Sequence, residues 1–303
     1  MAVMLRAKAE SLEEKGSAHE VILRDGRRLG FAEYGDGQGE PAFYFHGWPS
    51  SRLEAAPADP LAREFGVRLI ATDRPGHGLS DFKPRRRLED WPTDVEELAD
   101  KLGIEKFAVI GNSGGAPYAV ACGAKLPPRI TRILILCGLG PLEESACRRE
   151  MVFSSRLAIK VARRAPKLAA LVTGFAFRRL TRDEPVIFPE SMIGQLPECD
   201  RRALRCAEWR GSLARAICEA FRGGVRGPAW EGCIFTQPWR VSLKDLNAPV
   251  HLWHGEQDTI VPVENGRFYA RSLTRCEATF YPDEGHFSLP FNRMREIFAA
   301  GRT

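Results

Sequence analysis

The chain has 303 residues, of which 44% are hydrophobic, so it can bury a large core and is not a disordered protein. Its 44 basic and 39 acidic residues leave a net charge of +5, an excess too small to indicate a nucleic-acid partner. There is no long apolar leader or membrane-spanning run, and the eight cysteines form no C-x-x-C pair. We therefore expect a cytoplasmic protein with reduced thiols, no metal or cofactor, no nucleic-acid partner and no stable membrane insertion.

Short apolar runs alternate with helical segments along most of the chain. After a charged N-terminal extension (1–20), strands are predicted at 21–24, 27–34, 42–45, 68–72, 107–110, 132–136, 250–253 and 278–281. Helices are predicted at 94–102, 114–125, 263–273 and 292–299. This order predicts an α/β fold with a mostly parallel eight-stranded sheet that carries helices on both faces.

The alternation is interrupted between residues 141 and 245, where the segment is mostly helical and divided by prolines. We therefore assign residues 21–140 and 246–303 to the α/β core and residues 141–245 to a helical insertion. The insertion leaves and re-enters the sheet at strand ends, so it is expected to lie over the catalytic loops as a cap.

Gly111-Asn112-Ser113-Gly114-Gly115 lies directly between a predicted strand and a predicted helix. This is the context that a G-x-S-x-G nucleophile turn requires, because the turn must present the serine hydroxyl above the sheet. Side chains at Gly111 and Gly115 would obstruct the close approach of strand and helix. Ser113 is therefore the candidate nucleophile.

A serine hydroxyl is a weak nucleophile at neutral pH, so a base must remove its proton and a carboxylate must orient that base. Asp258 follows one late strand and His286 follows the last strand. These residues are the candidate acid and base. The competing acids are Glu256, Asp283 and Glu284. The histidines at 46, 77, 251 and 254 are assigned structural positions, and His19 is assigned to the N-terminal tail.

With these motifs, the chain resembles the capped serine-hydrolase branch of the α/β-hydrolase superfamily, which includes bacterial esterases. Two further marks support the resemblance, His46-Gly47-Trp48-Pro49 and the loop Asp73 to Ser80, which we interpret as a structural turn. The resemblance implies that the backbone N–H groups of Trp48 and Gly114 form the oxyanion hole. It also implies cleavage of a carboxylic ester, with a small-molecule substrate that carries an apolar acyl group.

The same residues distinguish this chain from several related enzymes. Epoxide hydrolases and haloalkane dehalogenases use an aspartate where this chain has Ser113, and hydroxynitrile lyases carry a lysine where it has Phe287. A C–C bond hydrolase with the same triad remains an alternative, although its Gly-rich oxyanion loop is replaced here by residues 47–52. A non-catalytic ligand receptor on the same fold is the alternative from another class, and haloperoxidase activity would be a side reaction of the triad.

Two features of the insertion bear on its partners. Its aromatic residues line a pocket or form the insertion's own core; they are Phe153, Phe175, Phe177, Phe188, Trp209, Trp230, Phe235 and Trp239. Basic residues recur at helical spacing from Arg156 to Lys167, with Leu157, Val161 and Ala165 on another face. We interpret the basic face as solvated, and an anionic partner or transient membrane contact is the alternative.

Overall fold

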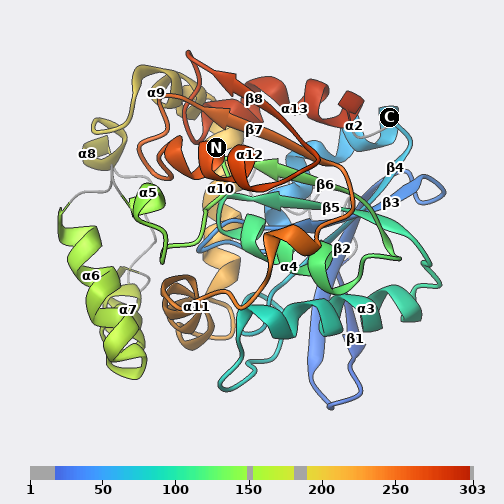
Figure 1. Cartoon of the computed structure of the whole chain (residues 1–303), viewed down its shortest axis with the longest axis horizontal. Helices are drawn as coiled ribbons and strands as arrows, with labels where there is room; N and C mark the ends of the chain where they lie inside the picture. The colour runs from blue at the N-terminus through green and yellow to red at the C-terminus, as the bar shows by residue number, and fades with distance from the viewer. Residues whose placement is uncertain (1–17, 149–152, 181–189, 301–303) are drawn as a thin grey trace, which may run out of the picture.

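A computed structural model describes residues 18–148, 153–180 and 190–300, which are built around a sheet of eight strands (Figure 1). The strands are β1 (Ala18–Ile22), β2 (Arg28–Gly35), β3 (Glu40–Phe45), β4 (Val67–Thr72), β5 (Phe107–Asn112), β6 (Ile130–Leu136), β7 (Val250–Gly255) and β8 (Cys276–Tyr281). Their spatial order is β1-β2-β4-β3-β5-β6-β7-β8. The pairs β1–β2 and β2–β4 are antiparallel, and all other neighbours are parallel. The predicted fold class is confirmed.

Alternating side chains of the central strands point to opposite faces of the sheet, and both faces are buried. Phe43 and Phe45 of β3 belong to one hydrophobic cluster, whereas Ala42 and Tyr44 belong to the other. A strand buried on both sides has an almost uninterrupted apolar sequence, which is why these strands were recognisable in the sequence.

Helices cover both faces of the sheet (Figure 1). The first cluster takes side chains from α3 (Trp91–Lys101), α4 (Ala116–Lys125) and α12 (Glu264–Ser272). The second takes side chains from η1 (Arg52–Ala58), α2 (Asp59–Glu64) and α13 (Ser288–Ala300). Short 3-10 turns lie at η2 (Leu88–Asp90), η3 (Ser113–Gly115) and η4 (Leu243–Asp245).

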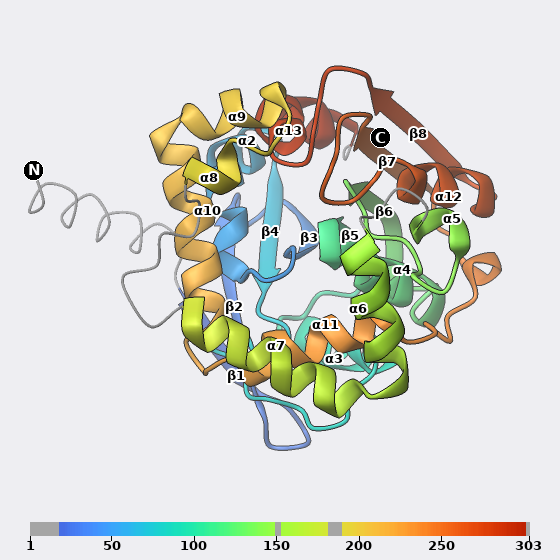
Figure 2. The ribbon, with the colours of Figure 1, turned by 90° about the vertical axis from the view of Figure 1, so that its left-hand side faces the viewer.

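Between β6 and β7 the chain forms the helices of the insertion. They are α5 (Ser145–Arg148), α6 (Phe153–Arg164), α7 (Pro166–Leu180), α8 (Glu190–Ile193), α9 (Glu198–Arg205), α10 (Ala207–Ala220) and α11 (Arg226–Thr236). Figure 2 looks onto the side where these helices lie, and they surround the ends of the central strands. The limits given above for the core and the insertion stay predictions.

The predicted apolar face of the basic helix is wrong at Val161. Among the α6 side chains that the structure describes, those of Ile159 and Ala162 are buried, and Val161 is 46% exposed. The reason is tertiary: α6 packs against α7 and α11, and Ile159 belongs to the hydrophobic cluster that includes Ile234 and Phe235 of α11. The side chains of Arg156 and Leu157 lie outside the described part of the chain.

Candidate active site

Ser113 lies in a sharp turn between β5 and α4. Its φ is +51°, in the left-handed region that non-glycine residues rarely occupy. A Cβ atom on Gly111 would lie 2.7 Å from the Cα of Ala116, and one on Gly115 would lie 2.0 Å from the carbonyl oxygen of Phe45. The predicted need for glycine on either side of the serine is therefore confirmed.

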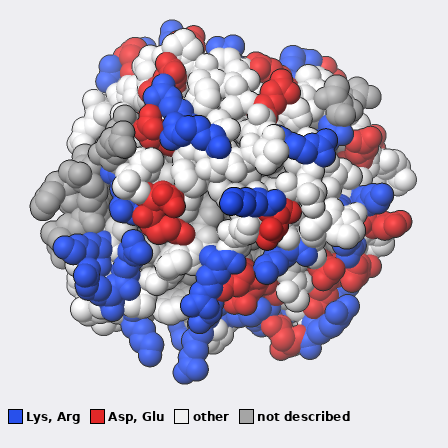
Figure 3. All heavy atoms as spheres, viewed as in Figure 1, with Lys and Arg blue, Asp and Glu red and all other residues white. Residues whose placement is uncertain are grey.

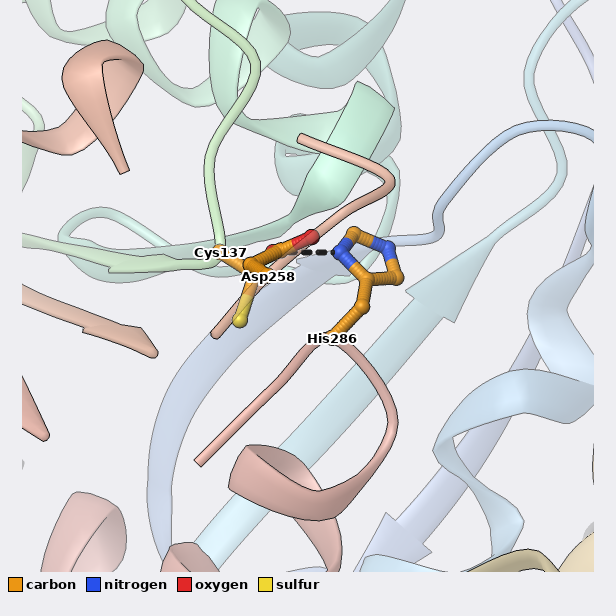
Figure 4. A group of neighbouring side chains, drawn as sticks. All are labelled: Cys137, Asp258 and His286. Atoms are coloured by element: carbon orange, nitrogen blue, oxygen red, sulfur yellow. Dashed lines mark hydrogen bonds and ion pairs between the residues drawn. The ribbon is translucent and has the colours of Figure 1, made fainter. Parts of the chain in front are cut away.

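Asp258 and His286 are in direct contact, as Figure 4 shows. Their loops follow β7 and β8, and His286 Nδ1 lies 2.7 Å from Asp258 Oδ2. The other carboxylate oxygen, Oδ1, accepts the backbone N–H groups of Ile260 and Val261 at 2.9 and 2.8 Å. The acid is thereby held in one orientation, with Oδ2 toward the imidazole of His286.

The charge environment of His286 favours its protonated form. Burial acts to lower the pKa of the imidazole, but the charge and hydrogen bond of Asp258, together with the charges of Asp200 and Glu54, raise it above its ordinary value of 6.5. The raised pKa makes the imidazole a stronger base for the proton of a hydroxyl group. Within the described residues Ser113 and His286 form no hydrogen bond with each other, and such a contact often forms only when substrate is bound.

Cys137 lies beside this pair (Figure 4). Its sulfur, an Asp258 oxygen and a His286 nitrogen lie within 4.8 Å of one another. These three atoms are of the types that bind metal ions in proteins, and they are close enough to share one. Burial and the neighbouring Asp258 raise the pKa of the Cys137 thiol well above its ordinary range. The thiol therefore stays protonated at neutral pH, a state that suits neither metal ligation nor nucleophilic attack.

Trp48 and Gly114, the candidate oxyanion donors, are neighbours. A Cβ atom on Gly114 would lie 3.0 Å from the Cβ of Trp48. Below them, Glu54 accepts hydrogen bonds from the Gly47 N–H at 2.9 Å and from the Asn112 side chain at 2.8 Å. Glu54 thus ties the loop after β3 to the residue that precedes Ser113.

Asp200 of α9 is a buried residue that the sequence reasoning missed. Its Oδ2 accepts the His286 N–H at 3.0 Å, and its Oδ1 accepts the Phe287 and Ser288 N–H groups, both at 2.8 Å. These groups lead into α13, whose first N–H groups have no acceptor within the helix. A Cβ on Gly285 would lie 2.5 Å from the Asp200 carboxylate. The insertion therefore supplies the cap of this helix and anchors the histidine loop.

A second buried carboxylate of the insertion, Glu231 of α11, binds two core arginines. Its oxygens lie 2.8 Å from Arg74 Nε and Nη2 and 2.9 Å from Arg86 Nη2, and Tyr118 also donates to it. Burial acts to raise the pKa of Glu231, but the charges of Arg74 and Arg86 hold it well below its usual range. His77 lies 3.3 Å away, and burial lowers its pKa to about 4, so it is neutral at pH 7.

Arg74 also reaches the loop that carries Trp48. Its Nη1 and Nη2 donate to the carbonyl oxygens of His46 and Gly47 at 2.5 and 2.9 Å. His46 accepts the Arg74 N–H through Nε2, so it supports this loop as the sequence predicted. His254 Nε2 lies 2.8 Å from the carbonyl oxygen of Val261 and 3.5 Å from Asp258 Oδ2, so this histidine packs beside the candidate acid.

A third contact joins the insertion to the loop Asp73 to Ser80. Arg52 binds Asp73 of the core and Glu219 of α10, each at 2.8 Å. Asp73 also accepts the Leu79 N–H at 2.9 Å, and Ser80 donates to the Asp73 carbonyl oxygen at 2.6 Å. The loop has the hydrogen bonding of the structural turn that was predicted.

The aromatic residues of the insertion divide into several environments. Trp209, Phe235 and Trp239 are buried, Phe177 and Trp230 are half-buried, and Phe175 is 69% exposed. The ring of Phe235 packs against Trp48 and next to Gly114, so it lies beside the candidate oxyanion donors. The side chain of Phe153 and all of Phe188 lie outside the described residues.

The fold and these loops define an α/β enzyme architecture whose polar side chains gather where the parallel strands end. A model of the alpha/beta hydrolase family matches residues 43–300. The chain therefore belongs to the alpha/beta hydrolase family.

Individual relatives agree with this family and differ in how much they cover. A bifunctional esterase/perhydrolase of Acinetobacter calcoaceticus is 22% identical over 88% of this chain and 92% of its own length. A serine hydrolase-like protein of Dictyostelium discoideum is 34% identical over 33% of this chain, and the match spans 28% of that protein. A solved thermophilic esterase from Thermogutta terrifontis has a TM-score of 0.67 and 22% identity, covering 94% of this chain and 97% of its own.

Proposed function

We propose that this hydrolase cleaves a carboxylic ester through an acyl-enzyme, with Ser113 as nucleophile, His286 as general base and acid, and Asp258 as the residue that orients the base. The observation that carries the proposal is the 2.7 Å contact between Asp258 and His286 at the same edge of the sheet as the strained Ser113 turn. The Acinetobacter relative is named as an esterase, which supports this reaction class.

In the first half-reaction, Ser113 Oγ attacks the acyl carbon while His286 Nε2 takes the hydroxyl proton. The carbonyl oxygen becomes an oxyanion, which the N–H groups of Trp48 and Gly114 stabilise by about 3 kcal/mol per donor. As the ester bond breaks, His286 returns the proton to the leaving alcohol, and the acyl group stays on Ser113.

In the second half-reaction, water attacks the acyl carbon and gives its proton to His286. The intermediate then collapses, the carboxylic acid leaves, and Ser113 recovers its proton. Asp258 keeps the imidazole in the tautomer that leaves Nε2 free to accept a proton in both steps.

We also propose that residues 141–245 form a cap that stays attached to the core. Three carboxylates support this: Asp200 binds the histidine loop, Glu219 binds Arg52, and Glu231 binds Arg74 and Arg86. Because the last two carboxylates pair with buried guanidinium groups, separation would leave charges unpaired in the interior. Phe235 beside Gly114 indicates an apolar wall for the acyl group.

The test compares Ser113→Ala with wild type on p-nitrophenyl esters of increasing acyl chain length. We expect Ser113→Ala to lose turnover by about 10³-fold or more while keeping its fold, and labelling by a fluorophosphonate to disappear. The chain-length series measures the acyl pocket. Undiminished turnover in Ser113→Ala would refute the assignment.

Cys137→Ala is the matched control, because Cys137 is the other nucleophilic side chain next to His286. We expect this variant to keep both ester turnover and fluorophosphonate labelling. Loss of activity in Cys137→Ala with retention in Ser113→Ala would assign the chemistry to the cysteine instead.

A further inference from the structure

The α6–α7 helix pair exposes an unusual amount of apolar surface. Among the described residues, nine large hydrophobic side chains are strongly exposed, and five of these lie on the pair. On α7 they are Leu168 (55% exposed), Leu171 (71%), Val172 (62%) and Phe175 (69%), and on α6 the fifth is Val161 (46%).

The four α7 side chains share one face of the helix, because they lie three, four and seven residues after the first of them, Leu168. Another side of α7 packs on α11 and the residue before it: a Cβ on the buried Gly174 would lie 3.5 Å from Val225 and 3.7 Å from Ala229. Gly174 and Phe177 thus face the protein, where Phe177 packs against Trp48 and Phe221, while the four large apolar residues point outward. Burial in the fold does not explain this arrangement.

Basic residues accompany the apolar face. Lys160, Arg163, Arg164 and Lys167 are exposed around the junction of the two helices, and residues 153–180 contain no aspartate or glutamate. None of these four cations forms a salt bridge with a carboxylate in the described part of the chain. Figure 3 shows Lys and Arg side chains gathered at the lower left, where Figure 1 places α6 and α7.

We propose that this surface, the α6–α7 face, docks on the surface of a bilayer that contains anionic phospholipids. Apolar side chains of this kind enter the boundary between headgroups and acyl chains, and the cations meet the lipid phosphates. A second copy of the chain is a poorer partner for this face, since pairing it with itself brings two sets of four cations together.

The contact is peripheral. No helix among the described residues is long and apolar enough to cross a membrane. The α6–α7 face belongs to the insertion, so a bound molecule would hold its insertion against the lipid. Docking is independent of the proposed ester cleavage, because none of these residues belongs to the triad.

The test is co-sedimentation of the full chain with vesicles of phosphatidylcholine alone or mixed in equal parts with phosphatidylglycerol. We expect binding to the mixed vesicles at low salt, about tenfold weaker binding to phosphatidylcholine, and weakening as salt increases. Absence of binding to the mixed vesicles at low salt would overturn the proposal. Self-association through this face, seen by light scattering without vesicle binding, would overturn it too.

Two variants separate the contributions of charge and apolar surface. The double variant Arg163→Gln with Arg164→Gln should weaken binding to the mixed vesicles by about tenfold or more. The double variant Leu171→Asn with Phe175→Asn should remove the component of vesicle binding that persists at high salt. Circular dichroism and turnover of a short-chain ester in solution check that both variants fold.

Matched controls lie elsewhere on the surface. Arg202→Gln with Arg205→Gln removes two exposed cations from α9, and Ile22→Asn removes an apolar side chain that is 58% exposed on β1. These controls should bind vesicles as wild type does. An equal loss in the controls would show that net charge or general hydrophobicity, not the α6–α7 face, governs binding, and would refute the proposal.

Discussion

Replacing Asp200 tests whether the insertion holds the histidine loop in its working position. Asp200 Oδ2 accepts one N–H group, that of His286, and Oδ1 accepts two. In Asp200→Asn one of these oxygens becomes an N–H₂ group, so at least one N–H loses its acceptor, at a cost of about 1–3 kcal/mol in unfolding free energy. Asp200→Ala removes all three acceptors and should cost about 3–5 kcal/mol.

The same substitution has a consequence for activity that a purely structural role would not produce. The Asp200 charge contributes to the raised pKa of His286, so its removal should lower that pKa. Because the base must be neutral to accept a proton, kcat/KM is present above the His286 pKa and is lost as pH falls through it. The acid limb of the kcat/KM profile should therefore move to lower pH in Asp200→Asn.

Ester turnover across a pH series and urea unfolding measure these two effects. Glu219→Gln is the control, because Glu219 is another insertion carboxylate that pairs with a core arginine without contacting the histidine loop. It should leave the acid limb where it is in wild type. An unmoved acid limb in Asp200→Asn, or an equal movement in Glu219→Gln, would refute the reasoning.

Two further substitutions test the packing behind the site. Gly115→Ala places a methyl group 2.0 Å from the carbonyl oxygen of Phe45, so we expect insoluble or unfolded protein on expression. The control is Gly37→Ala, whose methyl group meets nothing within 4 Å and which should fold. Soluble, active Gly115→Ala would contradict the close approach of α4 to the end of β3. Glu231→Gln leaves buried arginines without a counter-charge and should lower the free energy of unfolding by about 3–5 kcal/mol in urea. The exposed Glu198→Gln should unfold at the wild-type urea concentration, and an equally small change in Glu231→Gln would show that the buried cluster does not hold the insertion.

Short sequence patterns predict much of the fold and of the candidate active site. The central strands are buried on both faces, so each has a short apolar run that can be recognised in the sequence without knowing which strands pair with it. The serine turn is equally local, because the glycines at 111 and 115 meet Ala116 and the neighbouring strand end, and the motif lies in five consecutive residues. Asp258 and His286 were predicted from their places after late strands, since parallel strands end at one edge of the sheet.

Only the tertiary structure decided how the insertion meets this edge. Asp200 lies 86 residues before His286, Glu54 lies 58 residues before Asn112, and Glu231 lies 157 residues after Arg74, so no spacing rule connects these partners. An amphipathic pattern gives the period of a helix but not which neighbour it packs against, which is why Val161 was assigned to the wrong side of α6. The sequence near a residue specifies its backbone conformation, whereas the role of a buried charged residue depends on the partner that folding places beside it.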